Sequence, residues 1–370
     1  MKILSVFGTR PEAVKMAPVV QRLAQTPDVD SRVCVTAQHR QMLDQVLNLF
    51  DIQPDYDLNL MHEDQSLAEL SAAIFTHLDP VFVDYQPDWV LVQGDTTTVV
   101  ITSLLAYYRR IKVGHVEAGL RTHDKWQPFP EEINRRVAGV IADLHFAPTE
   151  QAELNLQIEG IPDEIITVTG NPVIDALQFV AEQPAPDEVT ALFNKLGIGD
   201  RELILVTAHR RENFGQPLEN ICFALKALAE RGDVEIVYPV HLNPNVQEPV
   251  RRILGEVPHI TLLPPLDYLP LVHLQKRAKL ILTDSGGIQE EAPAFGVPVL
   301  VMREVTERPE GVAAGTLKLV GTETGSIVRQ ATRLLDNPLA HAEMAKAVNP
   351  FGDGHAAERI VEALLAYPGR

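Results

Sequence analysis

One stretch of the chain combines a predicted strand, a glycine turn and a short helix in an order suited to anion binding. The apolar run Leu280–Leu282 predicts a buried strand, and Ser285, Gly286 and Gly287 precede a helical pattern that carries Glu291. Backbone N–H groups of such a turn point at an anion, and glycines let a phosphate approach closely. An acid one turn into the helix can bind a ribose diol. The alternative is an ordinary helix start with Ser285 as N-cap, so the turn alone leaves phosphate binding open.

Other chemically capable side chains also follow predicted strands, in both halves of the sequence. These residues are Arg10, Asp95, Glu117, His209, His241 and Ser285. Helix capping or solvation accounts for any one of them, and Asp95 in particular has the residue type of an N-cap. In open α/β sheets, however, ligands bind at the carboxyl ends of the strands. Six such groups at these positions therefore favour a binding site over capping alone.

The elements that must position these groups alternate between strand and helix along the whole chain. This alternation predicts two doubly wound α/β domains with parallel sheets, and a ligand cleft at their carboxyl edges. We expect an N-terminal domain over residues 1–171, joined by the C-terminal helix 355–370, and a C-terminal domain over residues 172–354. The polar, proline-containing stretch Glu182–Pro186 indicates a linker or surface loop.

Composition narrows the class of protein. The chain has 370 residues, 45% apolar and 22% charged, which fits two soluble domains. Its formal net charge of −18 argues against a nucleic-acid or anionic-membrane surface. The two cysteines, Cys34 and Cys222, form no Cys-x-x-Cys pair, so we expect buried thiols and no zinc site. The N-terminal apolar run is too short for a signal peptide and no run reaches spanning length, so we expect a cytoplasmic protein without a membrane partner.

The motifs favour proton transfer on a phosphorylated nucleoside compound. The sequence has no Gly-x-Gly-x-x-Gly after a strand, no Walker loop and no His-Glu-x-x-His helix, so it lacks the usual signatures of dinucleotide, ATP and zinc sites. The candidates for catalysis are Asp95, Glu117, Glu131 and His209, although an acid such as Glu131 in a first helical turn is routine. Carboxylates that share a cleft differ in how readily each holds a proton, so one can donate while another accepts.

A series of motifs between residues 8 and 310 resembles the non-hydrolysing bacterial UDP-N-acetylglucosamine 2-epimerases. In order, they are Gly8-Thr9-Arg10-Pro11-Glu12, Gly94-Asp95-Thr96-Thr97-Thr98, His115-Val116-Glu117-Ala118-Gly119-Leu120-Arg121, Pro130-Glu131-Glu132, His209-Arg210-Arg211-Glu212, Asp284-Ser285-Gly286-Gly287-Ile288-Gln289-Glu290-Glu291 and Glu307-Arg308-Pro309-Glu310. The resemblance implies two Rossmann-like domains in a glycosyltransferase-B-like fold, a homodimer, and no cofactor or metal. It also implies reversible conversion of UDP-N-acetylglucosamine to UDP-N-acetylmannosamine for bacterial surface-polysaccharide synthesis.

The resemblance assigns roles to particular residues. Catalysis falls to Asp95, Glu117, Glu131 and His209. Substrate binding falls to Arg10, Lys15, Leu266, Leu271, Ser285, Gly286, Gly287, Glu291 and Arg308. Some members have Gln and Phe where this chain has Leu266 and Leu271, which is harmless if backbone groups recognise uracil and weakens binding if side chains do. Some members also bind substrate at a second, activating site, and the matching segments here contain Gln38, His39, Arg211 and His241. For Gln38-His39-Arg40 the alternative is a polar helix entry.

The implied mechanism is elimination followed by re-addition. The C2 hydrogen of the sugar has no neighbouring carbonyl and is not acidic, but loss of UDP from C1 makes it removable and yields a 2-acetamidoglucal. Three other classes of protein share such a site: a hydrolysing epimerase that releases UDP, a glycosyltransferase that needs an acceptor, and a UDP-sugar sensor that never exchanges the C2 hydrogen.

Overall fold

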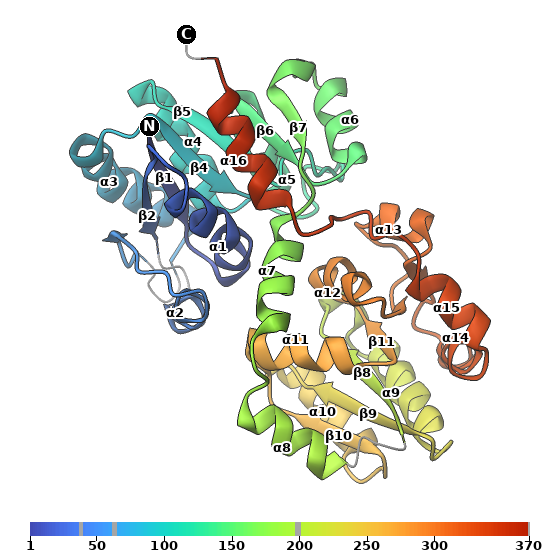
Figure 1. Cartoon of the computed structure of the whole chain (residues 1–370). Coiled ribbons are helices and arrows are strands. Elements are labelled where there is room, and N and C mark those ends of the chain that lie inside the picture. Colours follow the sequence, from blue (N-terminus) through green and yellow to red (C-terminus); the bar gives the residue numbers. More distant parts are fainter. Residues whose placement is uncertain (37–39, 61–64, 197–200, 369–370) are drawn as a thin grey trace. The chain divides into compact units, whose positions relative to one another are not determined.

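The chain forms two compact units. The structure is a computed structural model that describes residues 1–36, 40–60, 65–196 and 201–368 (Figure 1). Unit 1 comprises Met1–Ala176 and Phe351–Arg370, and unit 2 comprises Leu177–Pro350. The domain bounds inferred from the sequence stay a prediction. Among the described residues, no helix is both long and apolar enough to cross a membrane.

Unit 1 is built on a parallel sheet whose seven described strands have the order β3-β2-β1-β4-β5-β6-β7. The order reverses between β1 and β4, which pair directly, with Ile3 opposite Trp89. The strands are β1 (Lys2–Phe7), β2 (Asp30–Val35), β3 (Tyr56–Asp57), β4 (Trp89–Gln93), β5 (Lys112–Val116), β6 (Leu144–Ala147) and β7 (Ile166–Val168). In doubly wound folds, ligands bind in the crevice at this reversal, so the loops after β1 and β4 are the expected binding elements.

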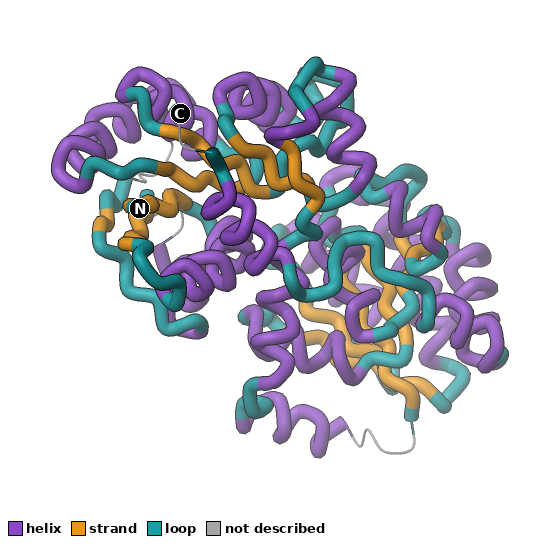
Figure 2. Tube along the Cα trace, turned by 45° about the horizontal axis from the view of Figure 1, so that its top comes forward, coloured by secondary structure: helices purple, strands orange, loops and turns teal. Residues whose placement is uncertain are grey.

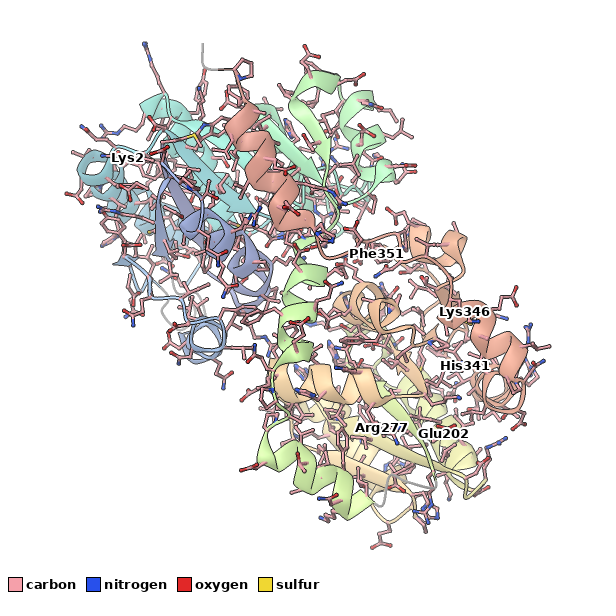
Figure 3. The ribbon with its side chains drawn as sticks, in the orientation of Figure 1. Lys2, Glu202, Arg277, His341, Lys346 and Phe351 are labelled. Atoms are coloured by element: carbon pink, nitrogen blue, oxygen red, sulfur yellow. The ribbon has the colours of Figure 1, made fainter. Side chains whose placement is uncertain are left out.

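Helices cover both faces of the unit 1 sheet (Figure 2). The helices α3, α4 and α5 pack in sequence on one another, and α1 packs against α2 and α16. Their bounds are α1 (Arg10–Ala24), α2 (Arg40–Leu49), α3 (Leu67–Tyr85), α4 (Thr97–Arg109), α5 (Glu131–Ile141), α6 (Glu150–Ile158), the 3₁₀ turn η1 (Asp163–Ile165), α7 (Pro172–Glu182), which runs across the division into unit 2, and α16 (Ala356–Ala366). Buried Phe351 begins the C-terminal segment that supplies α16, and its carbonyl accepts the Asn171 N–H over 2.7 Å (Figure 3).

Unit 2 repeats the same topology with a parallel sheet of described strands in the order β10-β9-β8-β11-β12-β13. The strands are β8 (Glu202–Thr207), β9 (Val234–Pro239), β10 (Ile260–Leu263), β11 (Leu280–Thr283), β12 (Val299–Val301) and β13 (Leu317–Leu319). Here the order reverses between β8 and β11, which pair with Thr207 opposite Thr283. The loops that follow these two strands begin with Ala208-His209-Arg210 and Asp284-Ser285-Gly286, so the reversal again coincides with the residues singled out from the sequence.

The helices of unit 2 also form two layers. The helices α9, α10, α14 and α15 pack together, and α11 packs against α8 and η3. Their bounds are α8 (Asp187–Leu196), η2 (Arg211–Asn213), α9 (Gln216–Ala229), α10 (Pro244–Leu254), α11 (Tyr268–Arg277), α12 (Gly286–Glu291), η3 (Ala292–Phe295), α13 (Pro309–Ala314), α14 (Thr324–Asp336) and α15 (Pro338–Ala345). His341 on α15 lies with Nε2 2.9 Å from the Lys279 carbonyl and ties this helix to the start of β11 (Figure 3).

The structure confirms the predicted α/β class of two doubly wound parallel sheets and corrects some local detail. The polar segment 51–60, for which no strand was predicted, contributes the short strand β3 at the sheet edge, because Cys34 and Val35 pair with Tyr56 and Asp57. Helices α6, α7, α8, α10, α13 and α15 were not predicted individually. In α15, which is short, half-buried or exposed positions outnumber fully buried ones, so its apolar periodicity is weak. Gln38 and His39 lie outside the described residues.

Candidate active site

Glu117 directly follows β5 and is the most tightly held acid of the unit 1 edge. Its φ of 62° lies in the left-handed region, which non-glycine residues rarely adopt. Lys15 Nζ lies 2.5 Å from Oε1 and 2.7 Å from Oε2, Asn171 Nδ2 donates to Oε1 over 3.0 Å, and Gln93 Nε2 donates to Oε2. The buried carboxylate therefore accepts from N–H donors at both of its oxygens.

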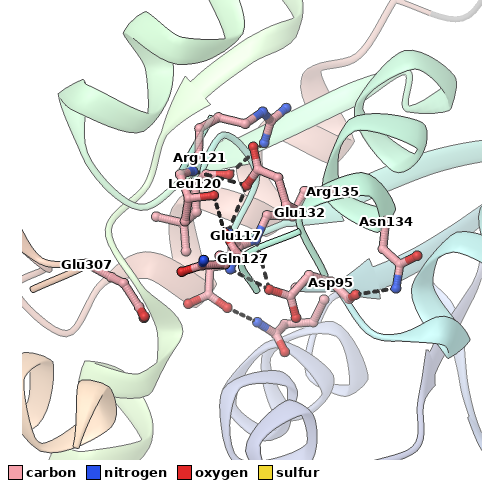
Figure 4. Close-up of polar contacts among 12 residues, drawn as sticks. Asp95, Glu117, Leu120, Arg121, Gln127, Glu132, Asn134, Arg135 and Glu307 are labelled. Carbon is pink, nitrogen blue, oxygen red and sulfur yellow. Dashed lines mark hydrogen bonds and ion pairs between the residues drawn. The ribbon is translucent and has the colours of Figure 1, made fainter. Parts of the chain in front are cut away.

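Asp95 lies at the end of the neighbouring strand β4 and is held on one side only. Its Oδ2 accepts from Arg135 Nε over 2.8 Å and lies 2.8 Å from Arg135 Nη2, while Asn134 Nδ2 donates to its main-chain carbonyl (Figure 4). Within the described residues, Oδ1 has no hydrogen-bond partner. Asp95 does not cap α4, since Thr96 is the N-cap and accepts from the Val99 N–H. The capping alternative for Asp95 is therefore wrong.

The helix α5 brings several groups to the same edge. Glu131 is the first residue of α5 and is half-buried, which also fits an ordinary acid in a first helical turn. Among the described residues, its side chain makes no ion pair. The next residue, Glu132, is fully buried and accepts the N–H groups of Thr122 and His123 over 3.0 and 3.2 Å. Arg135 Nη1 donates to Glu132 over 3.3 Å, so this arginine bridges Asp95 and Glu132.

Two buried histidines lie beneath these acids in adjacent strands. His115 on β5 is opposite His145 on β6. His115 Nε2 lies 2.7 Å from the carbonyl oxygen of Gly94, which requires the proton on that nitrogen. Burial lowers the pKa of His115 to about 4 and that of His145 to about 3, so both rings are neutral at pH 7. His115 therefore fixes the peptide that precedes Asp95 without adding a charge.

The loop after β1 is held by an acid of its own. Glu12 is buried and accepts the N–H groups of Gly8 and Thr9 over 3.0 and 2.7 Å, and the Thr96 hydroxyl over 2.7 Å. Burial raises its pKa above the usual value, against the lowering effect of these donors. Glu12 thereby ties the loop after β1 to the loop after β4, across the strand-order reversal. Arg10 begins α1 beside this contact, is half-buried, and has no side-chain ion pair within the described residues.

In unit 2 the predicted anion-binding turn is surrounded by positive charge. Ser285 is the N-cap of α12, yet its hydroxyl makes no capping bond. A Cβ added to Gly286 would lie 3.6 Å from Arg210 Nη2 and 3.9 Å from Arg308 Nη2, so both guanidinium groups stand next to the glycine turn. Arg308 Nε donates to buried Glu290, which fixes it in place. The turn thus combines close backbone access with two arginines, as a phosphate site requires.

His209 follows β8 and is oriented by Asp284. This fully buried carboxylate accepts the N–H groups of His209 and Arg210 over 2.9 and 2.8 Å, and Asn213 Nδ2 over 3.0 Å. The His209 ring stacks on His241 with 5.4 Å between ring centroids and an angle of 16°. Burial lowers the pKa of His209, while nearby Asp284 opposes that shift. The neutral ring can accept a proton or a hydrogen bond at neutral pH.

The remaining predicted residues of unit 2 lie around the same edge. Glu291 is buried and accepts from Gln275 Nε2 over 2.8 Å, and its Oε1 would lie 3.7 Å from a Cβ on Gly287. Leu266 precedes α11 and Leu271 lies in its first turn, where both are half-buried. Arg211 is exposed at the start of η2.

The structure therefore brings together Lys15 with Glu117, His209 with His241, and the Ser285-Gly286-Gly287 turn with Glu291 and Arg308. Sequence reasoning missed the side chains that hold these groups: Gln93, Arg135, Asn171, Arg210, Asp284 and Glu290. Most of these residues lie within or next to the motifs that carry the family resemblance. Their place in those motifs is the only feature of the sequence that could have indicated them. Among the described residues, no cluster of three or more His, Cys, Asp or Glu could hold a metal ion.

Comparison with known proteins decides the family. A family model described as UDP-N-acetylglucosamine 2-epimerase matches residues 21–365. The chain belongs to the UDP-N-acetylglucosamine 2-epimerase family. Among the relatives of this family, the UDP-N-acetylglucosamine 2-epimerase of Salmonella typhimurium is 56% identical over 99% of both chains, and that of Escherichia coli K12 is 55% identical over 98% of both. The resemblance seen in the motifs is thus confirmed over almost the full length.

Solved structures of epimerases from this family share the fold. The UDP-N-acetylglucosamine 2-epimerase of Neisseria meningitidis, solved with bound UDP-N-acetylglucosamine, has a TM-score of 0.88 at 49% identity and covers 99% of this chain and 100% of its own. A protein of Listeria monocytogenes described as a putative UDP-N-acetylglucosamine 2-epimerase has a TM-score of 0.93 at 48% identity and covers 99% of this chain and 96% of its own. The predicted glycosyltransferase-B-like fold, with two Rossmann-like domains, is therefore confirmed by these solved structures.

Proposed function

We propose that this chain interconverts UDP-N-acetylglucosamine and UDP-N-acetylmannosamine by eliminating UDP to a 2-acetamidoglucal and adding it back. Family membership over nearly the whole chain carries this proposal. A related epimerase of Methanocaldococcus jannaschii, 34% identical, was solved in complex with UDP-N-acetylglucosamine and UDP, which supports the ligand class. The chemistry suits the site, because elimination and re-addition need proton transfer and a held diphosphate, with no net redox change.

Unit 2 supplies the UDP site in this proposal. Ser285, Gly286 and Gly287 offer backbone and hydroxyl donors to the diphosphate, and Arg308 adds a fixed positive charge. Glu291 accepts from the ribose hydroxyls. Arg10, Leu266 and Leu271 complete the substrate-binding set, with Arg10 on the phosphates and the two leucines beside uracil. His209 would act beside the phosphates as a neutral ring, in line with its lowered pKa.

Unit 1 supplies the proton chemistry. Asp95, Glu117 and Glu131 reach one edge of its sheet from the loop after β4, the loop after β5 and the start of α5. Lys15, the counter-cation of Glu117, belongs to the same group. Removal of UDP gives C1 oxocarbenium character, and the C2 proton then leaves to a carboxylate. Protonation of C2 from the other face of the sugar and return of UDP to C1 give the epimer. A pair of acids that differ in their hydrogen bonding suits the two opposite roles.

The proposal extends to regulation and cell role. Arg211 and His241 would line a second, activating substrate site together with Gln38 and His39, which lie outside the described residues. The enzyme would act as a homodimer in the cytoplasm and feed surface-polysaccharide synthesis. Equilibrium sedimentation measures the dimer, and a sigmoidal dependence of rate on UDP-N-acetylglucosamine, lost in Arg211→Ala, tests the second site.

The experiment that tests the reaction is proton and phosphorus NMR of the purified protein with UDP-N-acetylglucosamine in heavy water, with no metal or nicotinamide added. Deuterium at C2 together with intact UDP-N-acetylmannosamine is the expected result. Accumulation of UDP and free N-acetylmannosamine would instead identify a hydrolysing enzyme. Binding without any C2 exchange would contradict epimerisation and leave a transferase or a sensor.

A further inference from the structure

Three helices of the chain start in the same way, and one of them differs in what its first asparagine contacts. The helices α7, α10 and α15 each begin with a proline that directly follows an asparagine, which is Asn171, Asn243 or Asn337. In each case Oδ1 accepts the N–H of the residue two places along, over 3.1, 2.9 and 3.0 Å, which is an ordinary helix cap. Asn337 is exposed, whereas Asn171 is only 1% exposed. Capping alone therefore does not account for the burial of Asn171.

The additional contacts of Asn171 reach two other parts of unit 1. Its side-chain Nδ2 donates to Glu117 Oε1 over 3.0 Å, and its main-chain N–H donates to the carbonyl of Phe351 over 2.7 Å. Among the described residues, the side-chain nitrogens of Asn243 and Asn337 donate no hydrogen bond. Because Oδ1 of Asn171 accepts the cap bond, the amide presents its NH₂ group to Glu117, and the donor has a fixed direction.

The segment that contains Asn171 is paired with a second segment of unit 1. Asn171 lies shortly before the chain leaves unit 1, and Phe351 begins the segment that returns to it. The two backbones pack closely at glycines, because a Cβ on Gly170 would lie 3.1 Å from the Gly352 Cα and one on Gly352 would lie 3.4 Å from the Asn171 nitrogen. Asp175 adds to this pairing, since it accepts two N–H groups at the start of α16 over 3.2 and 2.9 Å. The two segments are therefore held together, and Asn171 joins them to the active-site edge of the sheet.

On the basis of the proposed function, which places Glu117 in the active site, we infer that Asn171 is a positioning residue that couples Glu117 to the paired segments, residues 170–175 and 351–357. Lys15 also holds this carboxylate, but through a long side chain with several rotatable bonds. The Asn171 side chain is short, buried and fixed by its cap bond, so it sets where Oε1 lies relative to the backbone of the paired segments. A shift of either segment moves this donor, and turnover then depends on how the chain leaves and re-enters unit 1.

The first test keeps the cap and removes the donor. Asn171→Ser and Asn171→Asp both retain an oxygen that can cap α7, and both lack the amide N–H that Glu117 accepts. In each variant kcat for C2 exchange, measured by NMR in heavy water, should fall about tenfold or more, because a displaced active-site group is costly. The Kd for UDP should change less than about twofold, since the proposed UDP contacts belong to unit 2. Asn337→Ser and Asn337→Asp make the same changes at an ordinary cap and should leave kcat unaltered.

Two results would overturn this inference. A kcat within about twofold of wild type in both Asn171 variants would make this asparagine a cap and nothing more. A fall in kcat together with an equal loss of UDP affinity, or with an unfolded chain by circular dichroism in both variants, would show a structural role. Exchange by the wild type must be present in the same assay, and its absence would instead contradict the proposed function itself.

The second test reaches Asn171 through the returning segment. Gly352 has a φ of 143°, and a Cβ there would lie 3.4 Å from both the Asn171 nitrogen and Ile174 Cγ1. Gly352→Ala should therefore shift the segment and lower kcat about 3–10-fold. Gly160→Ala is the control, because Gly160 also belongs to unit 1 and has a positive φ of 86°, and a Cβ there would meet no atom of the described residues within 4 Å. This control should have the kcat of wild type.

The double variant Asn171→Ser/Gly352→Ala tests whether the two changes act on the same contact. If the shift reaches Glu117 through the Asn171 amide, Gly352→Ala should lower kcat less than about twofold further in the Asn171→Ser background. An undiminished second loss, or a folded Gly352→Ala protein with the kcat of wild type, would refute the coupling through the paired segments.

Discussion

The two sheet edges share one topology and carry opposite charge arrangements. At the reversal of strand order in unit 1, the groups that stand at the edge are carboxylates, and cations hold them, as Lys15 holds Glu117 and Arg135 holds Asp95. At the corresponding reversal in unit 2, the groups at the edge are guanidiniums around a glycine turn, and an acid holds Arg308. In unit 1, cations hold the acids at the edge, whereas in unit 2 an acid holds an arginine at the edge.

In the proposed function, this difference lets one framework serve two tasks. An acid that moves protons must keep its position and one accessible oxygen, so its partners approach from the far side. A diphosphate site needs exposed donors and backbone N–H groups, so an acid there serves to hold an arginine and does not face the ligand. Asp284, which directly precedes the turn, is likewise a supporting acid, because it accepts the backbone N–H groups of His209 and Arg210.

The largest effect should come from the unit 1 edge. Asp95→Asn preserves the shape and removes the proton acceptor, so kcat should fall about 10²–10⁴-fold. Because the proposed UDP contacts belong to unit 2, the Kd for UDP should change less than about twofold. Turnover measured by NMR and binding measured by calorimetry separate the two quantities. Near-normal turnover would remove Asp95 from the chemistry, and a large loss of UDP binding would contradict the separation of roles.

Acid should weaken unit 1 through its buried histidines. The folded-state pKa values of His115 and His145 are about 4 and about 3, below an unfolded value of about 6.5, so the unfolded chain binds protons first. Their contribution to the free energy of unfolding is complete above about pH 6.5 and falls as the pH drops toward the folded values. At pH 5 each histidine should have withdrawn about 2 kcal/mol.

Tryptophan fluorescence can report this loss from unit 1 alone, because both tryptophans, Trp89 and Trp126, belong to it. Urea unfolding at pH 7.5 and at pH 5 gives the loss in the free energy of unfolding between the two pH values. This loss should be smaller by about 2 kcal/mol in His145→Leu than in wild type. The control is His209→Gln in unit 2, whose ring is 38% exposed and which should not alter the fluorescence transition. A pH dependence of the same size in His145→Leu and wild type would contradict the assignment.

In unit 2 the expected loss is in affinity rather than turnover chemistry. Arg308→Gln removes a charged donor beside the glycine turn, so the Kd for UDP should rise about 10–100-fold, as expected for a hydrogen bond to a charged group. Arg329→Gln removes the same charge from an exposed position on α14 and serves as the control. Calorimetric titration with UDP compares them. Equal losses would mean that net charge, not the position of Arg308, sets the affinity.

The strands, and the sheet edge that carries the candidate residues, could be predicted from the sequence because both leave a local pattern. Buried parallel strands are continuous apolar runs, and the polar residue that ends each run, such as Asp95 or His209, lies at the carboxyl edge by construction. What the sequence could not show is which distant side chain reaches that edge. Arg135 lies 40 residues after Asp95, and Asn171 lies 54 residues after Glu117. Such pairings depend on helix placement, which no local pattern encodes.

The smallest predicted effects contrast two hydroxyls at equivalent helix starts. Thr96 accepts from the Val99 N–H at the start of α4 and donates to Glu12 over 2.7 Å, so Thr96→Ala should lower the free energy of unfolding by about 1–2 kcal/mol. Ser285 makes no capping bond, so Ser285→Ala should change stability by less than about 0.5 kcal/mol. If its hydroxyl is kept for the diphosphate, the same variant should instead raise the Kd for UDP about 3–10-fold. Urea unfolding and UDP titration of both variants test this contrast, since a stability loss in Ser285→Ala with unchanged UDP affinity would show that the hydroxyl caps α12 and does not serve the diphosphate.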